Sequence, residues 1–132
     1  MIEQLPGTFS LADEIDRFHP GTASSGRRAE TLVKTDRMRV VLMTMLKGTT
    51  LQDHSAPGPI TIHAIRGRFS VTSDGMTHDL PDGSLIAIGP GILHAVHAVD
   101  DGAFLLTISW PPATEYQPAN PGDDQHGLPG AG

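Results

Sequence analysis

The chain has 132 residues, enough for one domain but too few for a second sizeable core. Its net charge of −6 argues against a nucleic acid as partner, and the absence of cysteine excludes disulfides, thiolate metal sites and Fe–S clusters. The apolar runs fall well short of the ~18–20 residues that cross a bilayer. Because no basic segment followed by an apolar one opens the chain, we expect a cytoplasmic protein that neither enters a membrane nor is secreted.

A short helix is expected near the N-terminus. The segment Ser10–Asp13 is typical of a helix start, with a serine cap and an acidic residue near the positive end of the helix dipole. Leu11, Ile15 and Phe18 then recur on one face, and the His-Pro-Gly segment at 19–21 ends the helix. About two turns of helix are stable only when such an apolar stripe docks on another surface. We predict helix and loop over residues 1–36.

Short strands joined by turns are expected over residues 37–110. Glycine (15) and proline (11) make up roughly a fifth of the chain, above the usual share of about 12%. Apolar runs alternate with turn signals such as Asp-Gly at a spacing of roughly 8–12 residues, the pattern of an all-β sandwich or barrel. The expected strands are Met38–Leu46, Ile60–Ile65, Arg68–Thr72, Met76–Leu80, Ser84–Ile88, His94–Val99 and Ala103–Trp110. Residues 111–132, rich in Pro and Gly, have few apolar side chains to bury and are predicted to form a flexible tail.

Two sets of spaced glycines and histidines stand out: Gly48, His54 and Gly67, and then Gly83, Gly91 and His94. This spacing resembles the two motifs of the cupin superfamily, and the likeness covers the whole strand-rich region. The resemblance implies a small jelly-roll β-barrel, with His54 and His94 converging on a divalent metal (Fe, Mn, Ni or Zn) inside it. It also implies a homodimer, since relatives of this size commonly pair.

The match to these motifs is partial. Where the family has a second histidine and a glutamate as ligands, this chain has Ala56 and Ile60, so two of the four family ligands remain. A mononuclear metal site normally takes at least three protein side chains. Gln52 is one candidate substitute, because in a regular strand it shares a face with His54. His63 is another, provided that it points inward.

Strand alternation argues against His63. Aligning the strand on Gly67 puts Ile60, Ile62 and Ala64 inward and His63 outward, unless a bulge at residues 57–59 shifts the strand by one. The same alternation places His97 on the opposite face from His94, and Arg27-Arg28 is expected to be a solvated basic pair in a loop.

Three interpretations of His54 and His94 remain open: metal ligands, half-buried histidines that bond each other or water, or the polar end of a metal-free pocket. An inward Ile60 and Ile62 would make the barrel interior dry, which suits a mostly apolar small molecule with one polar group. We therefore expect a small-molecule-binding protein whose pocket contains Gln52, His54, Ile60, Ile62 and His94. The alternative is a metal-dependent enzyme, an oxygenase or isomerase on a small organic substrate. The sequence identifies no catalytic residue.

Overall fold

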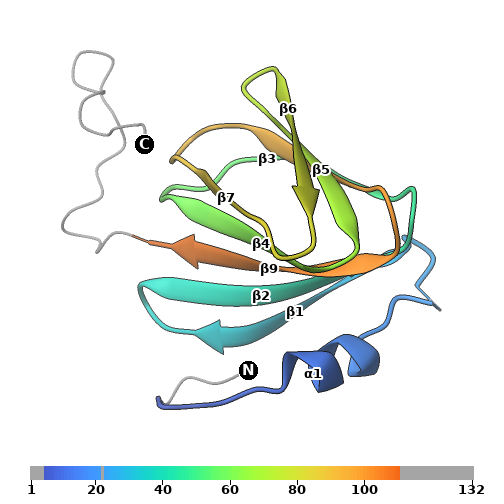
Figure 1. The fold of residues 1–132 in the computed structure, drawn as a ribbon. Helices are drawn as coiled ribbons and strands as arrows, with labels where there is room; N and C mark the ends of the chain where they lie inside the picture. Colours follow the sequence, from blue (N-terminus) through green and yellow to red (C-terminus); the bar gives the residue numbers. More distant parts are fainter. Residues whose placement is uncertain (1–4, 22, 111–132) are drawn as a thin grey trace.

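The computed structural model describes residues 5–21 and 23–110, which form two antiparallel sheets facing each other with one short helix outside them (Figure 1). The elements in chain order are α1 (Leu11–Arg17), β1 (Arg27–Lys34), β2 (Met38–Met45), β3 (Thr50–His54), β4 (Ile60–Arg66), β5 (Arg68–Ser73), β6 (Met76–Pro81), β7 (Leu85–Ile88), β8 (His94–Ala98) and β9 (Gly102–Ser109). The larger sheet has the order β1-β2-β9-β4-β7 and the smaller one β3-β8-β5-β6. The expected all-β barrel with a short N-terminal helix is confirmed.

Helix α1 begins and docks as its sequence predicts. The Ser10 side chain accepts a hydrogen bond from the Asp13 backbone N–H, at 3.4 Å. The buried Ile15 packs with Leu32, Leu42 and Ala103 on the outer face of the larger sheet, where they form a small second core. This cover removes the apolar stripe from water and stabilises a helix of seven residues that would be marginal alone.

Strand β1 corrects the predicted boundary at residue 37. The barrel begins ten residues earlier, because β1 pairs with β2 from Arg27 opposite Met45 to Lys34 opposite Arg39, with one irregularity at Leu32. The strand has no run of buried residues, since only Leu32 is buried in it. It lies at the edge of the sheet, where pairing with β2 rather than apolar alternation specifies the strand.

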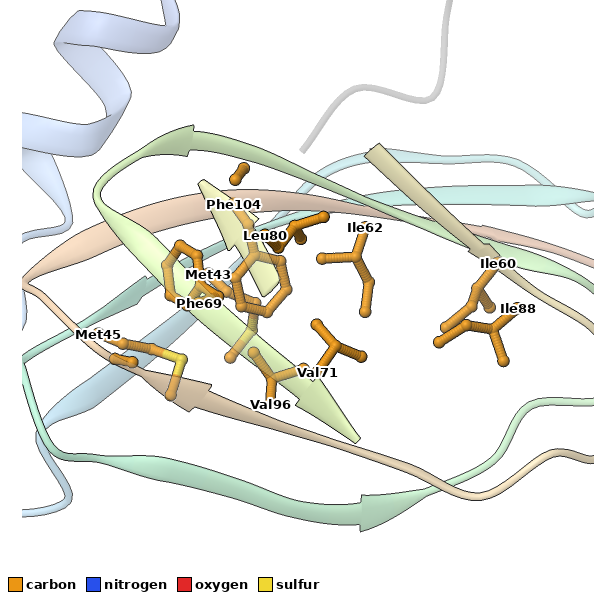
Figure 2. Packing of buried hydrophobic residues seen from close by; sticks show 12 residues of the cluster. Met43, Met45, Ile60, Ile62, Phe69, Val71, Leu80, Ile88, Val96 and Phe104 are labelled. Carbon is orange, nitrogen blue, oxygen red and sulfur yellow. The ribbon is translucent and has the colours of Figure 1, made fainter. Parts of the chain in front are cut away.

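The main core lies between the two sheets. Its residues run in a band from Met45 at one end to Ile60 and Ile88 at the other, with Phe69 and Phe104 packed near the Met45 end (Figure 2). Every one of these five side chains is less than a tenth exposed. The band gives the barrel two distinguishable ends along the strand direction.

No helix in the part of the chain that the structure describes has the length and apolar character needed to cross a membrane. The predicted flexible tail, residues 111–132, lies outside the described residues.

Candidate functional site

Two histidines from distant parts of the sequence meet at one end of the barrel. His54 ends strand β3, His94 begins β8, and the two residues are direct partners in the antiparallel pairing of these strands. Their ring centroids lie 6.3 Å apart and their planes are tilted by 46°. Pairing of β3 with β8 in the smaller sheet thus brings together the two histidines that the sequence singled out.

A β-bulge in β3 decides which side chains accompany His54. Leu51 pairs with Val96 and His54 with His94, so β3 carries one more residue than β8 between the two pairs. The extra residue shifts the alternation, and Leu51 and His54 both line the cavity described below. Gln52 is exposed and is not part of that lining. The expectation that Gln52 shares a face with His54 rested on regular alternation, which the bulge removes.

His94 is held in one orientation, and its burial favours the neutral form of the ring. It is only 6% exposed, and its Nδ1 donates to the backbone carbonyl of Ile92 at 3.2 Å, since a carbonyl oxygen can only accept. Burial lowers the pKa of His94 below its ordinary 6.5; the bond to Ile92 opposes the shift and the nearby His54 adds to it. The ring is therefore neutral at pH 7. Its Nε2 keeps a lone pair that can accept a hydrogen bond.

A cavity of about 470 Å³ lies beside the histidine pair, within the usual size range of small-molecule sites. It is lined by residues of both sheets: Ser25, Arg27, Ala29, Val41, Met43, Leu51, His54, Ser55, Ala56, Ile60, His94, Leu106 and Ile108. Most of these side chains are apolar. Ala29 lines the cavity and is nevertheless exposed, so the cavity opens to solvent beside the edge strand β1.

The remaining predicted residues take different places. Ile60 lines the cavity, whereas Ile62 is buried in the core and does not. Ile60, Ile62 and Ala64 are all buried, so His63, which alternates with them, lies on the outer side of β4. His97 is exposed, and its Nδ1 lies 2.8 Å from Oγ1 of Thr50 on the outer side of the smaller sheet.

Arg27 is a lining residue that the sequence did not indicate. It is the register partner of the core residue Met45, and directly opposed residues project from the same face of an antiparallel pair. The next residue confirms this alternation, because the Arg28 guanidinium lies over the Phe18 ring on the outer, helix-covered side, 5.1 Å from its centroid. The expectation of a solvated basic pair in a loop is therefore corrected for Arg27. Strand alternation predicts that Arg27 and Arg28 point to opposite faces, but only once residues 27–34 are known to form a strand.

No protein-family model and no curated protein sequence matches the chain. Solved structures do. Protein SPY1581 of unknown function from Streptococcus pyogenes is 28% identical, with a TM-score of 0.64 over 68% of this chain and 79% of that one. An RmlC-like cupin from Desulfovibrio desulfuricans is 26% identical, with a TM-score of 0.59 over 63% of this chain and 81% of that one.

The chain has the fold of the cupin superfamily. Salicylate 1,2-dioxygenase from Pseudaminobacter salicylatoxidans also shares this cupin fold, with a TM-score of 0.66 over 74% of this chain and 33% of that one. At 15% identity that likeness concerns the fold alone.

The metal site expected of a cupin needs more donors than the described residues supply. Within residues 5–21 and 23–110, no three His, Cys, Asp or Glu side chains form a group that could hold an ion. Ala56 and Ile60, at the two altered motif positions, form apolar cavity wall instead. Neither Gln52 nor His63 completes the shell, because neither lines the cavity with His54 and His94. This donor set does not fit a resident Fe, Mn, Ni or Zn ion, which normally has three or more protein ligands.

Proposed function

We propose that this cupin binds a small organic molecule in its barrel cavity, with apolar walls around the body of the ligand and His54 and His94 at its polar end. The observation that carries the proposal is the cavity itself, open to solvent and lined by aliphatic side chains with few polar groups. Such a composition is typical of ligand sites, where burial of apolar area supplies affinity and a few polar groups fix orientation.

His94 has the more defined role. Its Nδ1 donates a hydrogen bond to the Ile92 carbonyl, so Nε2 of the neutral ring is the atom that can accept a hydrogen bond from a ligand. A hydroxyl or another neutral donor is the group that this atom binds best. His54 is exposed at the same end of the cavity and forms the solvent side of the polar end.

Binding of phenylbutanol, measured by titration calorimetry, tests this proposal. We expect Ala29→Phe to weaken binding strongly, because it places a ring at the cavity mouth. The matched control Ala87→Phe adds the same ring at an exposed position opposite Thr61 of β4 and should leave binding unchanged. His94→Ala removes one hydrogen bond and is expected to weaken binding about fivefold. Equal binding of phenylbutanol by Ala29→Phe and the unmodified chain would overturn the proposal.

The second candidate, a metal-dependent oxygenase or isomerase, is supported by the pairing of both motif histidines and by the bond that orients His94, as metal-ligating histidines are commonly oriented. Against it stands the absence of a third donor among the described residues. The metal content of the chain after loading with divalent ions separates the two candidates.

A further inference from the structure

Arg27 introduces a positive charge into a cavity whose described lining has no negative one. The thirteen residues that line it include no aspartate or glutamate. Within residues 5–21 and 23–110, the ion pairs join Arg17 to Glu14, Arg66 to Asp16 and Arg68 to Asp79, and none involves Arg27. A guanidinium at a half-buried, largely apolar position is stabilised by an anion that satisfies its donors.

The position of Arg27 along the barrel is fixed by strand pairing. Arg27 lies opposite Met45, whereas Ile60 lies opposite Ile108 near the histidine pair. Figure 2 shows Met45 and Ile60 at opposite ends of the core. The strand positions of Arg27 and of the two histidines are therefore at opposite ends of the cavity. The aliphatic wall formed by Val41, Met43 and Leu106 lies between these ends.

From this arrangement we infer that the ligand is an amphipathic organic acid, with its carboxylate on Arg27 and its apolar body along the wall that leads to the histidines. The inference rests on the proposed function and adds the chemical class of the ligand. A carboxylate matches the planar guanidinium through two parallel hydrogen bonds. A phosphate, with its larger charge, would call for further cationic groups, and Arg27 is the only Lys or Arg in the described lining.

The charge of the whole chain opposes the binding of anions, so the charge of Arg27 must act locally. With a net charge of −6, the molecule as a whole repels anions, so an anion binds here only through the local field of Arg27. The low polarity of the surrounding walls strengthens that local field relative to bulk water.

Three probes with one apolar body and different ends test the inference: phenylbutyrate, phenylbutanol and phenylbutylamine, each titrated by calorimetry into the full chain. We expect phenylbutyrate to bind about tenfold more tightly than the alcohol, because a charge-assisted contact to Arg27 contributes about that much affinity. The amine should bind more weakly than both. Arg27→Gln is expected to weaken phenylbutyrate about tenfold while changing the alcohol little.

The adjacent residue supplies the matched control. Arg28→Gln removes the same charge from the next position but on the helix-covered side over Phe18, so phenylbutyrate affinity should stay within about twofold of the unmodified chain. Far-UV circular dichroism and thermal unfolding verify that both variants fold.

The outcomes separate the two claims. If phenylbutyrate and phenylbutanol bind equally and Arg27→Gln affects neither, the organic-acid inference fails and the binding function stands. If none of the three probes binds, the proposed function fails and the inference with it. Equal weakening by Arg27→Gln and Arg28→Gln would assign the effect to net charge and would also overturn the inference.

Discussion

Phe69 and Phe104 come from opposite sheets and meet edge to face, with ring centroids 5.1 Å apart and planes at 83°. Both rings are fully buried. The contact joins β5 to β9 across the barrel, at the end that contains Met45 (Figure 2). It places the two largest buried side chains at that end, whereas His54 at the other end is exposed.

Truncating this contact should destabilise the whole barrel. We expect Phe104→Ala to lower the free energy of unfolding by about 3–5 kcal/mol, from lost burial and a cavity that the rigid sheets cannot refill. Urea denaturation measures the change. The control Leu85→Ala removes an apolar side chain that is 61% exposed and should shift the free energy by no more than about 0.5 kcal/mol. Similar losses from the two variants would contradict the central role of the aromatic pair.

Gly67 is required for two reasons that can be measured separately. Its φ of 77° is in the left-handed region, and a Cβ there would collide with the Asp101 carbonyl. Gly75 has a φ of 76°, but a Cβ added there meets no atom within 4 Å. Gly75→Ala should therefore cost about 1–2 kcal/mol from backbone strain alone. Gly67→Ala should cost distinctly more in the same thermal unfolding measurement, and equal costs would argue against the collision.

His94 should make stability depend on pH in a definite direction. Its pKa is lowered in the folded chain, whereas an unfolded histidine titrates near 6.5. As pH falls below about 6.5, the unfolded state binds a proton that the folded state does not, so the free energy of unfolding decreases. This contribution is fully present above that pH.

The measurement compares the unmodified chain with His94→Gln by urea denaturation at about pH 7.5 and about pH 5.5. The variant should lose less stability on acidification than the unmodified chain. His97→Gln, the same change at an exposed histidine, serves as control and should retain the original dependence. An unchanged slope in His94→Gln would contradict the assignment.

Metal loading tests the donor set. After incubation with Fe²⁺, Mn²⁺, Ni²⁺ or Zn²⁺ and exhaustive dialysis, we expect elemental analysis to find well under one ion per chain, because two imidazoles bind weakly. Imidazoles must be neutral to ligate, so any residual binding should weaken further below about pH 6.5. Near-stoichiometric metal that is lost in both His54→Ala and His94→Ala would instead favour the enzyme.

Local patterns in the sequence were sufficient for much of the fold. The capped stripe around Ile15 predicted α1, and apolar runs between turn signals predicted seven of the nine strands within the described residues. Spaced glycines and histidines pointed to the superfamily and to His54 and His94 as partners. Each of these features depends on residues close together in the chain, or on a spacing that the fold imposes.

The sequence by itself determined seven of the nine strands in the described residues, because turn residues and burial act locally, and its resemblance to the cupin motifs implied the barrel and the convergence of two histidines. Only the tertiary structure decided which side chains accompany them. The bulge that turns Gln52 out of the cavity exists through the pairing of β3 with β8, and Arg27 enters the cavity because β1 pairs with β2. A side chain's direction in a strand depends on register, and register is set by a partner strand that a local pattern does not contain.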